Sequence, residues 1–281
     1  MTVDFLVIGH ITKDLQPDGF TLGGTVTYAA LTALRMGRRP ALLTRANPSI
    51  IQNGYYRGIE VYVVPSEHTT TFRNLYRDGH REQFVTEVAE PITIADVPPQ
   101  WRRPKIVLLG PVAQEVDPEL AAAFPNSLVG VVPQGWLRRW DTSGRVVPQR
   151  WEHAKTVLQA ARVLVLSDED LGEDISPLEE YKQLTEIVVL TQASRGCTVY
   201  WKGGAYHVPP RPANEVDPTG AGDVFTAAFL IRLEETGDPL AAAQFANVVA
   251  SFSVEAPGVK GIPSREVVEA WLAEHAQDVR R

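Results

Sequence analysis

The chain has 281 residues, of which 44% are hydrophobic, and its formal net charge is −7. This length suits one large domain, and this apolar content is enough for a substantial core. Acidic and basic residues are interspersed without a basic stripe, so nucleic acid is not an expected partner. The single cysteine, Cys197, excludes an internal disulfide and is typical of a reducing compartment.

The N-terminal segment MTVDFLVIGH is not expected to be a signal peptide. Asp4 comes early, and no basic region is followed by a long apolar core. The longest apolar runs, RVLVLS and EIVVLT, are strand-sized and far too short to span a bilayer. We therefore expect a cytoplasmic protein that has no membrane partner.

Six short apolar runs are predicted to be strands that are buried on both faces, because their apolar residues are continuous rather than alternating. They cover residues 4–9, 41–45, 105–110, 128–132, 162–166 and 186–191. Stretches with helical spacing of apolar residues cover 25–36, 148–161, 177–185, 221–235, 239–254 and 264–276. This alternation predicts an α/β fold with a doubly wound, mostly parallel sheet flanked by helices.

Residues 59–88 interrupt the alternation. The runs IEVYVVP and TTTFRNLYRDGHREQFVTEV are predicted to be antiparallel strands, with Asp78-Gly79 as a hairpin turn. We interpret them as a small β-sheet lid on a single domain of residues 1–281. The lid is built mainly from about 59–88 and the segment around 15–22, and an edge hairpin of the main sheet is the alternative. An exposed lid sheet also allows a homodimer through pairing with a second copy.

A second hairpin is predicted at 197–208, with its turn at Gly203-Gly204.

The stretch EVDPTGAGDVFTAAFL, residues 215–230, combines small residues with the start of an apolar helix. Gly220, Ala221 and Gly222 let a ligand approach the main chain, and the first N–H groups of a helix have no internal partners. Together with the helix dipole they form an anion site that suits a transferred phosphoryl group. Asp223, in the first turn, is either a residue that complements the dipole or a general base, and its spacing leaves both interpretations open.

Several other motifs are absent from the sequence. Neither G-x-x-x-x-G-K-[ST] nor G-x-G-x-x-G occurs, so a Walker A loop is excluded and dinucleotide binding is disfavoured. The six histidines form no H-E-x-x-H or similar spacing, so a zinc site is not expected.

The segment DPTGAGD, residues 217–223, resembles the C-terminal signature D-[TP]-x-G-A-G-D of the ribokinase, or PfkB, family of carbohydrate kinases. The resemblance extends over nearly the whole chain and implies a ribokinase-like fold. It also implies that Gly220, Ala221 and Gly222 form the anion hole and that Asp223 is the catalytic base. The segment 188–223 additionally resembles the plant myo-inositol 3-kinases.

On the acceptor side, Asp14 follows the first strand, and Gly23 and Gly24 precede a helix. A carboxylate accepts hydrogen bonds from two hydroxyls of a polyol, and glycines permit close contact with the main chain. Locally, a loop acid and an ordinary turn are equally good readings. The resemblance implies that Asp14, Gly23 and Gly24 bind the sugar.

The chain departs from the family pattern at Tyr28, where many relatives have an Asn that contacts the acceptor. We expect a reshaped pocket with Tyr28 in it, and a cyclitol acceptor is consistent because the inositol kinases also lack that Asn. Thr71, Arg73 and Asn74 either close over the acceptor or form an exposed strand face.

On the nucleotide side, the resemblance places Thr191, Ala193 and Gly196 near the phosphates and ribose, with Ala193 replacing the usual first glycine. Asn247 resembles an Asn near the adenine, and a polar residue on a helix surface is the alternative. Asp170, in SDED, stands where relatives have the Glu that organises Mg²⁺ through water. The alternative is an acidic helix N-terminus that Ser167 caps.

These features predict an ATP-dependent kinase that phosphorylates a hydroxyl of a small sugar or polyol, such as myo-inositol, with ATP and Mg²⁺. Whether a monovalent cation such as K⁺ is needed, as in many relatives, is open. One alternative is a nucleoside or vitamin kinase of the same fold, with Phe72 or Tyr76 stacking on the acceptor. The other is a non-catalytic ligand-binding protein on this scaffold.

Overall fold

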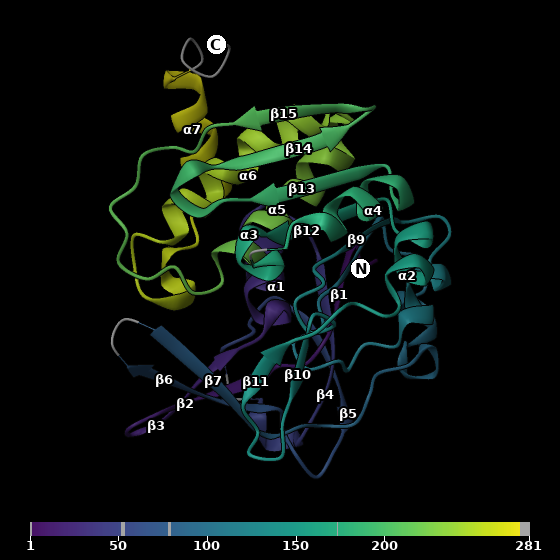
Figure 1. The fold of residues 1–281 in the computed structure, drawn as a ribbon. Helices are drawn as coiled ribbons and strands as arrows, with labels where there is room; N and C mark the ends of the chain where they lie inside the picture. Colours follow the sequence, from purple (N-terminus) through teal and green to yellow (C-terminus); the bar gives the residue numbers. More distant parts are fainter. Residues whose placement is uncertain (1, 52–53, 78–79, 173, 276–281) are drawn as a thin grey trace.

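The computed structural model describes residues 2–51, 54–77, 80–172 and 174–275 (Figure 1). Its main feature in this part of the chain is a nine-stranded sheet with the order β15-β14-β13-β12-β9-β8-β1-β4-β5. The strands from β5 to β13 run parallel, and β14 runs antiparallel to both of its neighbours. The bounds are β1 Phe5–Ile8, β4 Pro40–Ala46, β5 Glu60–Pro65, β8 Ile106–Leu109, β9 Leu128–Val131, β12 Val163–Ser167, β13 Ile187–Thr191, β14 Cys197–Trp201 and β15 Gly204–Val208. The doubly wound, mostly parallel sheet is confirmed.

The central strands are apolar throughout because helices cover both faces of the sheet. In β1, Phe5 and Val7 belong to one core and Leu6 and Ile8 to the other, and all four side chains are buried. The continuous apolar runs of the sequence therefore identified the central strands correctly.

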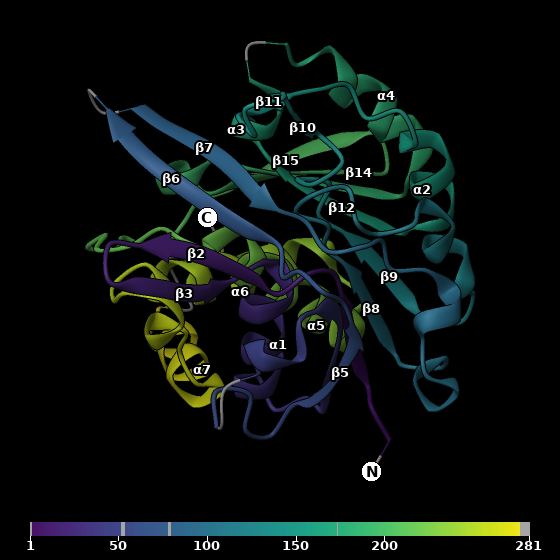
Figure 2. The same ribbon diagram turned by 90° about the horizontal axis from the view of Figure 1, so that it is seen from below.

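Helices lie on the two faces as Figure 2 shows. One core includes residues of α1 Thr25–Arg35, α5 Ala221–Thr236, α6 Pro239–Ser253 and α7 Arg265–Glu274, and the other includes residues of α2 Ala154–Ala160, α3 Asp168–Leu171 and α4 Ser176–Leu184. Short 3-10 helices are η1 Pro48–Ile50, η2 Ile94–Asp96, η3 Pro99–Trp101, η4 Pro118–Ala123, η5 Ala193–Arg195 and η6 Gly258–Gly261. In the described ranges, every helix is too short or too polar to cross a membrane.

The winding of the sheet reverses between β1 and β8. From β1 the chain proceeds to β4 and β5 on one side, and from β8 it proceeds to β9 and β12 on the other. Ligands of such sheets bind outside the carboxyl ends of the strands at this reversal. Gly9 and Gly110 follow the two strands in close contact, and a β-carbon on Gly110 would overlap the side chain of Thr25. The first turn of α1 therefore lies at the reversal point.

A smaller, four-stranded sheet has the order β3-β2-β6-β7, with bounds β2 Thr12–Gln16, β3 Gly19–Gly23, β6 Thr71–Arg77 and β7 His80–Glu87 (Figure 2). The smaller sheet contains only part of the lid expected at 59–88, because β5, the first strand of that segment, belongs to the main sheet. Strand β5 pairs in parallel with β4 at the edge of the main sheet, because Val61 and Val63 pack against its core. Strands β6 and β7 pair antiparallel as expected, and the proposed turn residues Asp78 and Gly79 lie outside the described residues.

A two-stranded hairpin, β10 Arg138–Trp140 and β11 Val146–Pro148, was not foreseen. The helix expected over 148–161 is shorter, because β11 occupies 146–148 and α2 begins only at Ala154. The second expected hairpin is present as β14 and β15.

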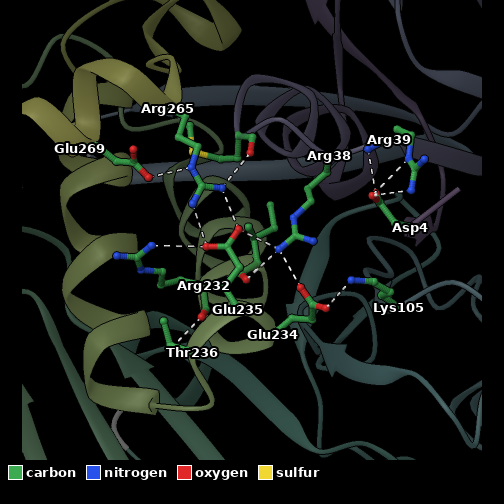
Figure 3. Close-up of polar contacts among 12 residues, drawn as sticks. Asp4, Arg38, Arg39, Lys105, Arg232, Glu234, Glu235, Thr236, Arg265 and Glu269 are labelled. Carbon is green, nitrogen blue, oxygen red and sulfur yellow. Dashed lines mark hydrogen bonds and ion pairs between the residues drawn. The ribbon is translucent and has the colours of Figure 1, made fainter.

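A network of ion pairs fixes α7 to the rest of the molecule (Figure 3). Arg265 donates to both carboxylate oxygens of Glu235, at 2.7 and 2.9 Å, and to the carbonyl of Met36 at 3.2 Å. Arg38 donates to Glu235 at 2.9 Å and to Glu234 at 2.8 Å. Since Glu235 lies near the C-terminal end of α5, this network is about 18 Å along the helix axis from Asp223.

Candidate active site

The turn before α5 is held in place by the end of α6. The amides of Val216 and Asp217 both donate to the carbonyl of Val254, at 2.8 and 3.0 Å. The Asp217 carboxylate in turn accepts from the amides of Thr219 at 3.0 Å and Gly258 at 2.8 Å. These bonds preorganise the turn.

Gly220 takes a left-handed conformation with φ of 77°, and α5 begins at the next residue. The Ala221 amide donates to Pro218 at 3.1 Å, while the amides of Gly222 and Asp223 have no preceding helical turn to bond. A β-carbon on Gly222 would meet nothing within 4 Å, so the helix begins on an open face. Such a helix start suits an anion.

Asp223 lies half-buried in this first turn and accepts a hydrogen bond from the Thr25 side chain of α1. Burial raises the pKa of Asp223 to about 6, although the hydrogen bond from Thr25 lowers it. Of the neighbouring charges, Asp170 raises this pKa further and Arg138 lowers it. A carboxyl group poised near neutral pH is suited to proton transfer.

Tyr28 connects this turn to Asp14, which is expected to bind the acceptor. Its buried ring lies against the α-carbon of Gly220, where a β-carbon would overlap it. Burial is the main cause of a raised Tyr28 pKa, and the charges of Asp217, Asp223 and Asp14 add to it. The protonated Tyr28 side chain therefore stands among acids from both halves of the site.

Strands β2 and β3 carry the residues expected to bind the acceptor. A β-carbon on Gly23 would overlap the Asp14 carboxylate, so glycine is needed where that carboxylate crosses β3. Thr12, directly opposite Gly23, lies 3.5 Å from the other Asp14 oxygen. Gly24, with φ of 87°, caps α1, where the carbonyl of His10 leaves no space for a side chain. The structure thus brings Asp14, Gly23 and Gly24 together beside Tyr28.

The lid residues divide between the two faces of the smaller sheet. Phe72 is buried in a small apolar cluster, whereas Arg73 is exposed with its guanidinium 5.3 Å from the Phe84 ring centre. Asn74 accepts from Gln83 across the strand pair at 3.0 Å. Asn74 is therefore on the inner face with Phe72, and Arg73 points away. Tyr76 is part of β6, and the structure describes its backbone without its side chain.

The expected metal residue, Asp170, forms a capping box with Ser167. One of its oxygens accepts from the Ser167 amide at 2.9 Å and hydroxyl at 2.8 Å. The charge of the same carboxylate also raises the pKa of Asp223. Among the described residues, no three His, Cys, Asp or Glu side chains gather as ligands for a metal ion.

The residues expected to bind the nucleotide lie around the end of β13 and the start of β14. Thr191 ends β13 and pairs with Ser167 and Cys197 on the flanking strands. Gly196, with φ of 85°, lies against the carbonyl of Val208. The Asn247 side chain donates to the carbonyls of Val208 at 2.9 Å and Pro209 at 3.1 Å. Asn247 is thus buried and anchors the segment that leads to the turn, and an adenine contact stays a prediction.

Ala193 begins η5 with a positive φ of 50° and is exposed. Burial raises the pKa of Cys197 to about 12, as befits a core residue rather than a nucleophile.

Sequence reasoning missed Thr25 and Arg138. Thr25 directly follows the Gly23-Gly24 pair and begins α1, a signal that could have found it. Arg138 carries no local signal, because its position depends on a hairpin that the sequence pattern did not reveal.

The fold is that of the ribokinase-like kinases. A solved pyrophosphate-dependent kinase in the ribokinase family, complexed with a pyrophosphate analog and myo-inositol, has a TM-score of 0.79 to this chain. The match covers 95% of this chain and 99% of that chain at 24% identity, which shows the fold alone.

The sequence defines the family. A model of the pfkB family carbohydrate kinases matches residues 146–265. Inositol 3-kinase of Zea mays is 33% identical over 255 residues, or 81% of this chain and 66% of that protein. Inositol 3-kinase of Oryza sativa subsp. japonica is 42% identical over 256 residues, or 81% of this chain and 62% of that protein. The chain belongs to the pfkB family, as its DPTGAGD segment indicates, and spans slightly less than two thirds of these relatives.

Proposed function

We propose that the chain is an ATP-dependent kinase that phosphorylates a hydroxyl of a small sugar or polyol, with myo-inositol as the first candidate. One observation carries the proposal. Tyr28 lies against Gly220, in the turn at 217–222 that we propose binds the phosphoryl group (the anion turn), and stands among Asp14, Asp217 and Asp223. The proposed acceptor side and the anion turn therefore meet at Tyr28. The relatives named inositol 3-kinase support the choice of acceptor.

In this proposal the acceptor lies between the strands β2–β3 and the start of α5. The two oxygens of Asp14 accept hydrogen bonds from neighbouring hydroxyls, and Gly23 and Gly24 let the ring approach the main chain. Tyr28 fills the position of a smaller polar residue in other sugar kinases and limits the depth of the pocket. The hydroxyl that reacts lies next to Asp223.

Asp223 accepts the proton of that hydroxyl as its oxygen attacks the terminal phosphorus of the donor in line. The new O–P bond forms while the bond to the leaving ADP breaks. Of the anion hole expected at Gly220, Ala221 and Gly222, the Ala221 amide already donates to Pro218. In this proposal the amides of Gly222 and Asp223 and the helix N-terminus therefore stabilise the charge on the transferred group. Positioning supplies most of the remaining acceleration.

The donor set around Asp170 fits Mg²⁺ held mainly through water. Mg²⁺ prefers oxygen ligands and retains several waters, and one Asp170 oxygen is already engaged by Ser167. Asp170 would bind the ion's water shell together with the donor phosphates, and the ion would neutralise phosphate charge. ATP itself would lie along the edge formed by Thr191, Ala193, Gly196 and Asn247.

The smaller sheet would close over the acceptor as a lid and limit wasteful hydrolysis of the donor. Within one domain of residues 1–281, this lid comprises β2, β3, β6 and β7 and leaves β5 to the main sheet. A homodimer through the exposed lid sheet and a cytoplasmic location are further parts of the proposal, which the sequence suggests.

The test is an acceptor panel with purified protein, ATP and Mg²⁺, with and without K⁺. Myo-inositol, ribose, fructose and adenosine are compared by ADP release and by ³¹P NMR of the product, and pyrophosphate replaces ATP in a parallel series. We expect phosphorylation of a polyol or sugar with ATP. Turnover of adenosine alone would favour the nucleoside kinase. Turnover with pyrophosphate alone would exclude ATP as the donor, and no turnover with any acceptor would favour a non-catalytic binding protein.

A further inference from the structure

In the described residues, four connections join the main sheet to the smaller sheet, and they meet at His10. His10 itself lies in the connection 9–11 between β1 and β2. The other connections are 66–70 between β5 and β6, Gly24 between β3 and α1, and the segment that starts at residue 88 after β7. His10 is fully buried and contacts each of these three through its ring or its main chain.

The hydrogen bonds of the His10 ring define its tautomer. Nε2 lies 3.1 Å from the carbonyl oxygen of Glu90, which can only accept, so Nε2 carries the proton. Burial is the main cause of a lowered His10 pKa, Arg45 adds to this effect, and Glu115 and Glu90 oppose it. The ring is therefore neutral, and its Nδ1 accepts from the Thr70 hydroxyl at 2.7 Å.

Thr70 extends this chain of hydrogen bonds. Its hydroxyl oxygen accepts from the Ala89 amide at 3.1 Å, while the hydroxyl proton goes to His10. The Thr70 carbonyl accepts from the Lys13 amide of β2 at 2.9 Å. Both the His10 ring and Thr70 are buried, and a buried polar group that loses its partner is costly. The connections are therefore held as one hydrogen-bonded unit.

The main chain of His10 is fixed as well. Its amide donates to the buried carboxylate of Glu115 at 2.9 Å, and the same carboxylate accepts from the amides of residues 112–113, just after β8, at 2.9 and 2.7 Å. The His10 carbonyl lies against Gly24 at the start of α1. Two residues expected to bind the acceptor thus lie close to this unit, Gly24 by direct contact and Asp14 next to Lys13 on β2.

We propose that His10 is a positioning residue for the acceptor, which fixes the smaller sheet on the main sheet and so places Asp14 and Gly24. Its neutral ring accepts from one connection and donates to another, and its carbonyl supports a third. The residues expected to bind the donor follow other strands, so the effect falls on the acceptor. This role rests on the proposed function, in which Asp14 and Gly24 bind the acceptor.

Variants at three positions separate this role from a general one. His10→Leu removes both ring bonds, and His10→Gln keeps a donor for the Glu90 carbonyl. Thr70→Val removes the hydroxyl at nearly the same volume, and Thr70→Ser retains it. His68→Leu is the matched control, because it removes an exposed histidine from the same connection 66–70. Thermal melting identifies any variant that fails to fold, and Thr70→Val and Thr70→Ser carry the test if His10→Leu is one of them.

The first readout needs no substrate. ¹⁵N NMR of histidine-labelled protein at pH 7.5, with His10→Gln to assign the signal, should show a protonated Nε2 and an unprotonated Nδ1. Hydrogen exchange of the Lys13 amide should quicken in Thr70→Val, although this amide bonds the Thr70 carbonyl and not the substituted side chain. Thr70→Ser and His68→Leu should exchange like the wild type. A charged His10 ring, the opposite tautomer, or an unchanged Lys13 exchange rate would overturn the proposal.

The second readout separates the KM values for acceptor and donor. We expect His10→Leu and Thr70→Val to raise the acceptor KM by about 3–10-fold, the size expected for one lost buried hydrogen bond. The donor KM should stay the same, Thr70→Ser should restore the acceptor KM, and His68→Leu should have no effect. Equal increases in both KM values, or an unchanged acceptor KM in Thr70→Val, would contradict the role. If the wild-type protein shows no turnover, the proposed function fails, while NMR and hydrogen exchange still decide whether His10 joins the two sheets.

Discussion

The ring of Tyr28 lies directly against the α-carbon of Gly220, so the residue that begins the anion turn has no room for a side chain. Gly220 also has a φ of 77°, which a residue with a β-carbon adopts only under strain. Position 220 is thus restricted twice, once by its own backbone and once by a residue far away in the sequence.

Gly220→Ala should therefore abolish most activity and lower stability, because either the turn or the Tyr28 ring must move. Gly237→Ala is the control, since Gly237 ends the same helix with a φ of 69° and open space around its α-carbon. In both variants the alanine adopts a left-handed conformation at a cost of about 1–2 kcal/mol, which urea unfolding measures. Only Gly220→Ala should lose turnover, and equal turnover in both would contradict the packing argument.

Asp223→Asn should reduce kcat by at least about 100-fold, the usual contribution of a general base. Its affinity for the donor, measured by calorimetry, should remain. Burial disfavours the ionised carboxyl in the folded state, so the neutral amide should leave the protein no less stable at pH 7.5. A destabilised Asp223→Asn protein would indicate that the carboxylate serves the fold.

The activity of the wild-type protein should rise with pH through about 6, because the base must lose its proton to act and its pKa is raised to about 6. Activity that is flat between pH 5 and 7.5 would contradict the assignment of Asp223. The profile is measured as kcat/KM at saturating donor.

Tyr28→Phe should keep the ring packing beneath Gly220 and hence the stability of the protein. The hydroxyl stands among three carboxylates, of which Asp14 belongs to the proposed acceptor half of the site. We expect loss of this hydroxyl to raise the KM for the acceptor several-fold. The donor KM should not change. An increase in the donor KM alone would show that Tyr28 contacts the donor rather than the acceptor.

Asp170→Asn tests the metal assignment and the electrostatics together. The Mg²⁺ concentration for half-maximal rate should rise, because an amide binds the water shell of a cation less strongly than a carboxylate. The acid limb of the pH profile should move to lower pH, because Asp170 raises the pKa of Asp223. If neither quantity changes, Asp170 is a helix cap without a role in the reaction.

Features that depend on neighbouring residues in the sequence were predictable, whereas features that depend on contacts between distant segments were not. The central strands were predictable because β1, β8 and β12 are buried on both faces and therefore uninterrupted in their apolar pattern. The turn at 220–222 was predictable because glycine and a following apolar helix are local features. Strand β5 was assigned to the lid because its membership of the main sheet depends on pairing with β4, which its own residues do not encode.

The candidate site shows the same limit. Asp14, Gly23 and Gly24 were singled out by the family resemblance, since their local motifs alone left other interpretations open, and the structure brings the three residues together. Arg138 was missed, because only the docking of a short hairpin on β7 sets where its side chain lies. Asn247 was noted for its resemblance to an Asn near the adenine, with a polar residue on a helix surface as the alternative. Its buried bonds to Val208 and Pro209 follow from tertiary packing, which the sequence does not show.

The ion-pair network around Glu235 allows a prediction for stability that leaves the site untouched. Arg265→Met should lower the free energy of unfolding by about 1 kcal/mol, a value at the upper end for partly exposed pairs. Arg150→Met is the control, because the Arg150–Glu180 pair is exposed and should contribute almost nothing. Turnover should be equal in both variants, and a loss in Arg265→Met alone would mean that α7 influences the site.

The most direct test of the central claim is the transfer of phosphate from ATP to a polyol by the wild-type chain and by Asp223→Asn. Product is detected as a phosphate monoester by ³¹P NMR, with the myo-inositol, ribose and fructose reactions run in parallel. We predict a monoester with at least one of these acceptors in the wild-type reaction and almost none with Asp223→Asn. Equal product from both proteins, or ADP release without any monoester, would contradict the account.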